Sequence, residues 1–364
     1  MMTPTDPFKA HYLPVEAWPR LCQKQWHEAF ADGGLFDTPK PALSWRKATI
    51  RKTWTGFGSF ISWTILEDLF DPDAGVTNLV TRAHMTLYIK ALQNAGYASL
   101  TLFCRIQEVY DAARIMDPSQ DWAWLRTASR RLRKRARPIR NKHLKLQPAQ
   151  ALEQLAHDLM DEAQSSKQMS FYQRALRFRD GLMIGVLIRR PLRLKNFASL
   201  TLSTNLILHH QSATMTFQRD EMKGKRPFDV RFPSVYFEAL QIYLALYRPY
   251  LLSLHPREDK VLTDALWISN EGQQLADLSL RNAIKRRTKV AFGIDMTPHL
   301  FRDASVTTLV RHAPASARLT RTILGHTSID ITNKHYNQSR MIETSRRHTA
   351  LIEKLTTNAT QKVS

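Results

Sequence analysis

The sequence predicts a mainly α protein with one small antiparallel β-sheet, an α+β fold divided between two domains. Over most of the chain, apolar residues recur at the steps of three and four that suit a helix. Between residues 199 and 233 the pattern changes to short alternating segments rich in Thr, Val, Leu and Ile, which predicts strands. At 364 residues and 42.1 kDa the chain exceeds one average core, so two domains are expected.

The first part of the chain divides into an extension and a helical domain. Residues 1–43 are punctuated by prolines and carry Trp18 and Trp26 as anchors, and we expect an extension rather than a domain. Residues 44–128 are expected to form the helical domain, with helices over residues 49–70, 76–95 and 99–116. The first helix places four apolar side chains on one face: Trp54, Phe57, Ile61 and Ile65. Such a stripe favours a core face over a base-stacking surface.

The charge balance indicates a polyanionic partner. Lys and Arg number 53 against 32 Asp and Glu, which gives a net charge of +21 and favours nucleic acid. A membrane is not expected, because the longest apolar run, "GLMIGVLI" ending at Ile188, is too short to span a bilayer. The N-terminus lacks the apolar stretch of a secretory signal. Cys22 and Cys104 stand far apart in the sequence, which disfavours a disulfide or a zinc site and suits a reducing cytoplasm. We therefore expect a cytoplasmic protein that is associated with the nucleoid when it is bound to DNA.

A strongly basic segment separates the two helical regions. Ten Lys and Arg residues and no acid lie between Trp122 and Lys145. Such a run can be a solvated face or a loose tail, but its position favours an interdomain linker, residues 129–148, that lies on DNA phosphates. The linker residues expected on phosphate are Arg130, Arg131, Arg133, Lys134, Arg135, Arg137 and Arg140. Four cations at the start of the first predicted helix are expected to bind DNA as well: Arg46, Lys47, Arg51 and Lys52.

Residues 149–364 are expected to form the second domain. Two helices come first, over residues 151–164 and 171–190. Three strands of a small antiparallel sheet are then predicted over residues 199–210, 212–219 and 228–233. The helical periodicity returns over residues 234–251, 279–292, 299–312, 319–326 and 341–355.

The cationic and hydroxyl side chains of this domain suit chemistry at a phosphodiester. Two arginines can hold the non-bridging oxygens in bidentate fashion, which lysine does less well. A tyrosine hydroxyl, with an ordinary pKa near ~10, becomes a nucleophile when its proton is removed beside cations. A lysine of lowered pKa can protonate the departing 5′ oxygen. No acid cluster suited to Mg²⁺ is evident near these residues in the sequence, so we expect a site without metal, nucleotide or other cofactor.

Four short boxes carry these residue types in a fixed order. "RPLRLKNFASL" supplies Arg193, and "EMKGKRPFDVRFP" supplies Lys223 when Pro233 is used as the anchor, with Lys225 as the alternative. Further on, "HLFRDASVTTL" and "ILGHTSIDITNKHY" supply the remaining residues: His299, Arg302, His326 and Tyr336. A His-x-x-Arg box alone has almost no specificity in a chain with 13 His, whereas all four in order are highly specific.

In these boxes the chain resembles the tyrosine recombinases, also called the phage integrase family. The resemblance covers residues 150–345, and the preceding helical domain agrees with it in kind only. Three features depart from the commonest pattern of the family. Asn196 stands where an acid often orients the first arginine, Arg190-Pro191 stands where a glycine is frequent, and ten residues separate His326 from Tyr336, one more than usual.

The resemblance implies a role for each residue of the boxes. Tyr336 attacks a DNA phosphate, forms a 3′-phosphotyrosyl bond and releases a 5′-hydroxyl. Lys223 protonates the leaving oxygen. The phosphate is held, and the tyrosine proton managed, by Arg193, Arg302, His299 and His326. The resemblance further implies a C-shaped clamp on double-stranded DNA, made by a helical core-binding domain and the catalytic domain. It also implies a homotetramer on paired sites that exchanges strands through a Holliday junction.

Several alternatives stay open at this point. A type IB topoisomerase uses similar chemistry, although the order and spacing of the boxes favour a recombinase. A recombinase-derived DNA-binding accessory protein without catalysis is the non-enzyme alternative. His299 is also compatible with a polar residue at a helix start, and His326 with a packing histidine. Residues 341–355 suit a helix that docks on a neighbouring subunit or on its own domain. The DNA site, and the choice between integration, excision, dimer resolution and transposition of a mobile element, are not encoded in these patterns.

Overall fold

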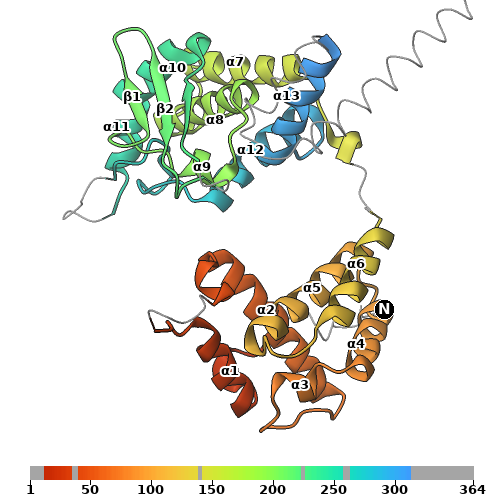
Figure 1. The fold of residues 1–364 in the computed structure, drawn as a ribbon. Coiled ribbons are helices and arrows are strands. Elements are labelled where there is room, and N and C mark those ends of the chain that lie inside the picture. Colours follow the sequence, from red (N-terminus) through yellow and green to blue (C-terminus); the bar gives the residue numbers. More distant parts are fainter. Residues whose placement is uncertain (1–11, 35–39, 138–141, 223–225, 257–262, 313–364) are drawn as a thin grey trace, which may run out of the picture. The chain divides into compact units, whose positions relative to one another are not determined.

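The protein forms two compact units, Met1–Asn141 and Lys142–Ser364 (Figure 1). The computed structural model describes residues 12–34, 40–137, 142–222, 226–256 and 263–312. These residues are mostly helical and include one three-stranded antiparallel sheet, which confirms the predicted α+β fold class. Each unit encloses a separate hydrophobic core. Among the described residues, no helix is both long and apolar enough to cross a bilayer.

The N-terminal unit is helical in all its described elements. They are α1 Arg20–Phe30, α2 Lys47–Leu66, α3 Val76–Leu79, α4 Arg82–Asn94, α5 Ser99–Met116 and α6 Ala123–Arg135, with 3-10 turns at Val15–Ala17 and Pro41–Ser44. The core lies where α5 packs against α1, α2 and α6. Aromatic rings fill its centre: Phe60 stacks on Trp63 at 5.7 Å between ring centroids and meets Tyr88 edge-to-face at 5.2 Å.

The segment predicted as an N-terminal extension contributes a helix to this core, which differs from the expectation for residues 1–43. Trp18 and Trp26 are buried with their ring centroids 5.4 Å apart, and Trp18 also meets Phe57 of α2 at 5.0 Å. The indole N–H of Trp18 donates to the carbonyl of Leu13 at 2.9 Å, so its polar atom has a partner. Trp18 and Trp26 bury a large apolar area in the core, and this burial stabilises α1 as part of the N-terminal unit.

The predicted buried stripe of α2 is correct for Phe57 and Ile61 and wrong at its end. Ile65 is 47% exposed, whereas Phe60 and Thr64 are fully buried. The stripe therefore runs through positions 57, 60, 61 and 64, which is the drift of a 3.6-residue period rather than steps of four. Thr64 is accommodated because its hydroxyl donates to the carbonyl of Ile61 at 2.7 Å.

The helix predicted over residues 76–95 is divided into α3 and α4. Thr81 has an extended backbone, and its side-chain oxygen accepts from the amide of His84 at 3.1 Å. This is the geometry of an N-cap, which starts a new helix and satisfies one of its free amides. The helix predicted over residues 99–116 is present with those bounds.

The first part of the predicted basic linker, residues 129–148, is helical. α6 continues to Arg135, with Leu125 and Ser129 buried against α5 and the arginines and lysine on its outer face. The hydroxyl of Ser129 donates to the side chain of Gln107 at 2.7 Å. Because α6 has an inward face of its own, the residues up to Arg135 belong to the N-terminal unit, and the boundary between the units falls after Asn141.

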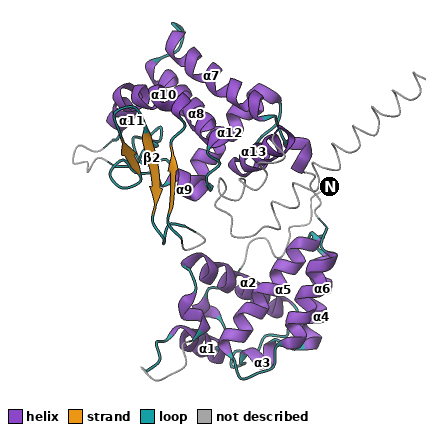
Figure 2. Ribbon diagram, turned by 45° about the horizontal axis from the view of Figure 1, so that its top comes forward, coloured by secondary structure: helices purple, strands orange, loops and turns teal. Residues whose placement is uncertain are grey.

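The C-terminal unit combines helices with the sheet. Its helices are α7 Ala149–Ser165, α8 Phe171–Arg189, α9 Leu194–Ala198, α10 Phe237–Ile242, α11 Arg248–Ser253, α12 Asp277–Phe292 and α13 Pro298–His312. Short turns of other helical types are η3 Lys142–Lys145, η4 Ser234–Tyr236 and the π-helical η5 Tyr243–Tyr247. Ser170 and Gln173 form a capping box at the start of α8. Figure 2 shows the sheet on one side of α8 and α13 on the other.

The sheet is three-stranded and antiparallel, as predicted, and its strand order is β1-β2-β3. The strands are β1 Leu206–Leu208, β2 Ala213–Phe217 and β3 Phe228–Arg231. In β2, Ala213, Met215 and Phe217 are buried and the two threonines between them are half-buried. This alternation is the period of two that the sequence shows, and it seats the sheet on the core of the unit.

α8 is the central helix of the unit and carries a buried charge. Asp180 is fully buried and accepts from Arg179 at 2.8 Å and from Arg287 of α12 at 2.9 Å. Arg179 in turn donates to the carbonyl of Ile268 at 2.6 Å. A buried carboxylate is tolerated only when paired and hydrogen-bonded, and this one fixes α12 against α8.

Candidate active site

The connection between α8 and α9 is the centre of the candidate site. Arg193 occupies the N-cap position of α9, and partial burial lowers the pKa of its guanidinium from the ordinary value. Arg190 donates through Nε to the carbonyl of Arg231, at the end of β3, at 2.9 Å. Arg190, the first residue of the Arg190-Pro191 pair, therefore ties this connection to the sheet.

α13 approaches the same connection from the other side. Arg302 is 6% exposed, and its Nη1 donates to the carbonyl of Pro191. Ser305, one turn later, donates to the carbonyl of Ile188 at 2.7 Å. His299 precedes Arg302 by three residues, on the first turn of α13, and its side chain is exposed. The His-x-x-Arg spacing thus places one residue at the surface and the other against the α8–α9 connection.

The two predicted catalytic arginines lie close enough for the charge of Arg193 to affect the pKa of Arg302. The pKa of Arg302 is lowered to about 10, first by burial and then by the positive charge of Arg193, against the opposing effect of Asp303. Two cations held together in a partly desolvated place favour an anion between them. Their guanidinium groups can offer bidentate donors to the non-bridging oxygens of a phosphodiester.

The β2–β3 hairpin, which leads to the predicted lysine, is bound to α9. The side-chain amide of Asn196 donates to the carbonyl of Glu221 at 3.3 Å and lies 3.2 Å from the sulfur of Met222. Asn196 therefore contacts the hairpin, where the family pattern has an acid that orients the first arginine. Lys223 and Lys225 lie outside the described residues.

The last predicted box also lies outside the described part of the chain. His326, Tyr336 and the segment 341–355 belong to it, so their assignments rest on the sequence. Of the six predicted catalytic residues, the structure describes His299, Arg302 and Arg193, and it brings the two arginines together.

The predicted DNA-binding residues of the N-terminal unit fall on two helices. Arg46 occupies the N-cap position of α2. The first turns of this helix carry exposed Lys47, Arg51 and Lys52, where the helix dipole adds positive potential. Lys52 Nζ also lies 3.8 Å from the carboxylate of Glu108, which is buried. The basic residues of the second group are exposed on α6 and just beyond it: Arg130, Arg131, Arg133, Lys134, Arg135 and Arg137. Arg140 lies outside the described residues.

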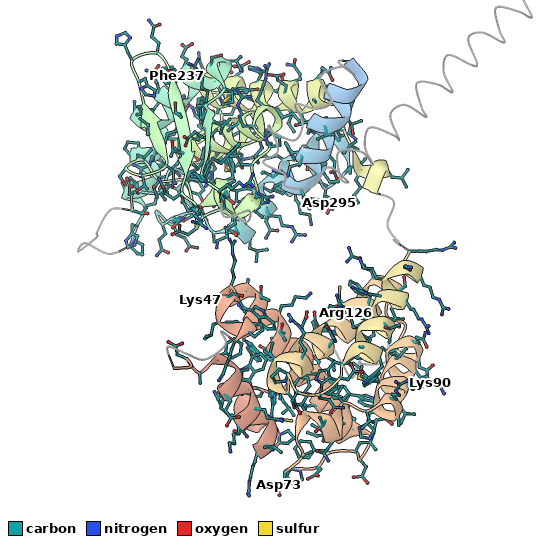
Figure 3. All side chains as sticks on the ribbon, viewed as in Figure 1. Lys47, Asp73, Lys90, Arg126, Phe237 and Asp295 are labelled. Carbon is teal, nitrogen blue, oxygen red and sulfur yellow. The ribbon has the colours of Figure 1, made fainter. Side chains whose placement is uncertain are left out.

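The sequence patterns did not single out two polar clusters beside the site. Asn205 and Glu221 bind each other at the base of the hairpin, at 3.0 Å. Asp295, labelled in Figure 3, lies just before α13 and forms ion pairs with Lys145 of η3 and Lys285 of α12. Hydrogen bonds from both lysines hold the pKa of the Asp295 carboxyl well below its usual range. Single polar residues in turns give no periodic signal, and their partners are distant in the chain.

Comparisons with known proteins agree with this architecture. The model of the phage integrase family matches residues 153–343. The crystal structure of the XerH site-specific recombinase bound to difH substrate, a pre-cleavage complex, superposes with a TM-score of 0.54 at 15% identity, covering 93% of this chain and 98% of that chain. A post-cleavage complex of XerH with a palindromic difH substrate gives the same values. No curated protein sequence matches significantly. Because the family model covers more than half of the chain, the protein belongs to the phage integrase family of tyrosine recombinases.

Proposed function

We propose that the protein is a site-specific DNA recombinase that cuts and rejoins DNA through a covalent bond to Tyr336. The observation that carries the proposal is the pairing of Arg193 and Arg302: the buried Arg302 donates to the carbonyl of Pro191, two residues before Arg193, and the charge of Arg193 contributes to its lowered pKa. A phosphodiester under attack gains negative charge on its non-bridging oxygens, and preorganised cations in a desolvated site stabilise that charge strongly. Family membership supports this chemistry over a purely structural role for the pair.

The proposed reaction is a transesterification. The oxygen of Tyr336 attacks phosphorus, the bond from phosphorus to the 5′ oxygen breaks, and the tyrosine proton passes to a histidine or to water. Lys223 gives a proton to the departing 5′ oxygen, which leaves as a hydroxyl. Arg193 and Arg302 bind the non-bridging oxygens, and two histidines hydrogen-bond the phosphate: His299 and His326. The phosphotyrosine keeps the energy of the broken bond, so a second 5′-hydroxyl can reverse the step without a nucleotide.

The proposed substrate is double-stranded DNA carrying a specific site. The net charge of +21, the exposed cations of α6 and those at the start of α2 support phosphate contacts by the N-terminal unit. The structural likeness to XerH, solved on its DNA substrate before and after cleavage, supports the same class of ligand. We further propose a homotetramer on two paired sites and strand exchange through a Holliday junction, as the family resemblance implies.

A suicide substrate tests the nucleophile. DNA nicked close to the cleavage position loses its 5′-hydroxyl fragment, so a covalent protein–DNA adduct accumulates and is resolved on a denaturing gel. The wild-type protein is expected to form the adduct, and Tyr336→Phe is expected to form none, because the phenyl ring has no nucleophilic oxygen. Tyr250→Phe, a half-buried tyrosine of α11, is the matched control and should retain adduct formation. An adduct on Tyr336→Phe would disprove the assignment.

A second assay separates recombination from its alternatives. Two labelled duplexes that carry the site are expected to exchange strands and to form a four-way junction. Relaxation of supercoiled DNA without exchange between duplexes would instead indicate a type IB topoisomerase activity. Tight and specific DNA binding without any adduct would indicate an accessory protein that has lost catalysis.

A further inference from the structure

The connection between α8 and α9 is short and sets the direction of Arg193. α8 ends at Arg189, and Arg193 is the N-cap residue of α9, so only residues 190–192 join the two helices. Pro191 has a fixed φ near about −65° and no N–H group, so the helix cannot continue through it. The amide of Leu192 donates instead to the carbonyl of Arg190 at 2.7 Å. The carbonyls at the end of α8 therefore need partners from outside the helix.

α13 supplies such partners through two side chains that lie one turn apart. The hydroxyl of Ser305 donates to the carbonyl of Ile188 at 2.7 Å, and Nη1 of Arg302 donates to the carbonyl of Pro191. Residues three apart lie on the same face of a helix, so one face of α13 holds the connection at two points. Ser305 is half-buried and Ile188 is 6% exposed. Loss of the hydroxyl would deprive the carbonyl of a buried residue of this bond, which is unfavourable.

The hydrogen bond of Ser305 opposes the repulsion between two cations on separate elements. Arg302 belongs to α13 and Arg193 to the start of α9, and the charge of Arg193 lowers the pKa of Arg302, which indicates an unfavourable interaction. Before a phosphate binds, this repulsion favours separation of α13 from the connection. The apolar side chains of Leu300 and Phe301 hold α13 on the core, but apolar burial has no preferred direction. A hydrogen bond has a defined length and angle, so Ser305 fixes where α13 lies against the end of α8.

We propose that Ser305 is a positioning residue for the two arginines: by holding α13 at the end of α8, it sets the place of Arg302 relative to Arg193. The inference rests on the proposed function, which assigns both arginines to the phosphate. Bidentate donors must meet the oxygens at fixed distances, and a misplacement of about 1 Å in a catalytic group can cost about 10²-fold in rate. The hydroxyl of Ser305 is bound to the carbonyl of Ile188, so it acts on the reaction only through the arginines.

Ser305→Ala removes the donor with little change in volume. Adduct formation on the suicide substrate at saturating protein is expected to slow by about 10²-fold. The affinity for the intact duplex, measured by fluorescence anisotropy, is expected to stay at the wild-type level, because phosphate contacts elsewhere supply most of it. Ser253→Ala is the matched control: this exposed serine of α11 donates to the carbonyl of Tyr250 at 2.7 Å, and its loss should leave the rate unchanged.

A double-mutant cycle separates this role from a purely structural one. Arg193→Lys removes the bidentate contact with the phosphate and is expected to slow adduct formation by about 10²–10³-fold. Ser305→Ala should cost little once Arg193 has been replaced, so the double variant is expected to stay within about tenfold of Arg193→Lys alone. Two independent effects would instead multiply to a loss of about 10⁴–10⁵-fold.

Ser305→Cys decides the matter if Ser305→Ala does not fold. Its thiol has nearly the same size as the hydroxyl but is a weak donor, so slower adduct formation and the same coupling to Arg193→Lys are expected. Thermal unfolding midpoints verify that each variant is folded at the temperature of the assay.

The outcomes distinguish the inference from the function beneath it. A wild-type rate in Ser305→Ala, or losses that multiply in the double variant, overturns the positioning role and leaves the recombinase intact. A wild-type protein that forms no adduct overturns the proposed function and the inference together. A slower rate at unchanged affinity, with losses that do not multiply, establishes that Ser305 acts through the arginines.

Discussion

Arg302 has two roles that a lysine at the same position could not combine: a structural hydrogen bond and a proposed contact with the phosphate. Its Nη1 donates to the carbonyl of Pro191, so the guanidinium helps to hold the connection that carries Arg193. Its guanidinium group is planar and presents several N–H groups in fixed directions, a geometry that suits the non-bridging oxygens of a phosphate. Burial and the charge of Arg193 lower the pKa of Arg302 to about 10, and it stays protonated at neutral pH. A lysine in the same surroundings would lose its proton more readily, since its ordinary pKa is lower.

Arg302→Lys is therefore expected to slow adduct formation by about 10²–10³-fold, the size seen when one transition-state donor is removed. The rate is measured with the suicide substrate at saturating protein, so that weaker DNA binding does not enter. Arg20→Lys, at an exposed position of α1, is the control and should leave the rate unchanged. A wild-type rate in Arg302→Lys would show that a single positive charge suffices at this position.

At the level of residues, the sequence predicts which side chains belong to the candidate site better than it predicts which side chains contact each other. The box pattern selected Arg193 and Arg302, and the structure brings them together. The same pattern pointed to Asn196 only as a departure from the family, because its partner Glu221 is 25 residues away and no periodicity marks it. Ile65 was assigned to the core for its apolarity, although the helical period turns it to solvent.

Glu108 is a buried carboxyl between α2 and α5, and it forms an ion pair with Lys52, one of the residues proposed to bind DNA. Glu108 lies against Gly56, where even a Cβ atom would come within 2.2 Å of its Oε2. It pairs with Arg105 at 3.1 Å and with Lys52 at 3.8 Å. Burial raises the pKa of this carboxyl, and the two cations only partly oppose the effect. The charged form is therefore disfavoured in the folded unit, and Lys52 is shared between Glu108 and any phosphate.

Glu108→Gln is expected to have two effects: a pH-dependent increase in the stability of the N-terminal unit, and tighter DNA binding at low salt. A carboxyl with a raised pKa stabilises the fold while it is protonated, and this contribution is lost as the pH rises through the folded pKa. Glu108→Gln should thus raise the Tm of the N-terminal unit at pH 7, with the difference shrinking toward pH 4. It should also tighten binding to any DNA sequence at low salt, because an acid beside Lys52 is removed. Calorimetry and titrations of binding against salt measure the two effects.

The matched control is Glu67→Gln, an exposed carboxyl at the end of α2. It removes the same charge from the same unit without altering a buried group, so its Tm is expected to stay constant with pH relative to wild type. A lower Tm for Glu108→Gln at pH 7 would show that the ion pairs with Arg105 and Lys52 outweigh the cost of burial.

Secondary elements were predictable where their period was strong. The alternation in β2 and the apolar stretch of α8 both mark buried segments, and both elements are present. The division at Thr81 was not predicted, because one capping hydrogen bond decides it. The basic run concealed a helix, since Leu125, Ser129 and Leu132 are too few to stand out among so many charges.

At the scale of the whole molecule, α6 is expected to supply much of the affinity for DNA that does not depend on the DNA sequence. Changing Arg130, Arg131, Arg133 and Arg135 to Gln should weaken binding to specific and random duplexes alike. Each phosphate contact that is lost lowers the slope of log affinity against log salt by about 0.9. The slope is measured by fluorescence anisotropy over a range of salt concentrations.

A control with the same loss of charge tests whether position matters. Four exposed cations away from α2 and α6 are changed to Gln together: Arg20, Lys24, Lys90 and Lys167. This variant should retain nearly the wild-type salt slope. Equal slopes for the two variants would mean that only net charge governs binding, and α6 would then have no special place on the DNA.

A short tether makes the two units a bivalent ligand. Six residues separate the end of α6 from η3, and extended chain geometry limits this span to roughly 25 Å. The residues after this span do not lengthen the connection, because Lys145 is paired with Asp295 and Leu146 packs on the core of the C-terminal unit. When one unit is on DNA, the other is held near it at an effective concentration in the millimolar range. We therefore expect each unit to bind DNA weakly by itself and to release readily, and the full chain to dissociate from DNA more slowly.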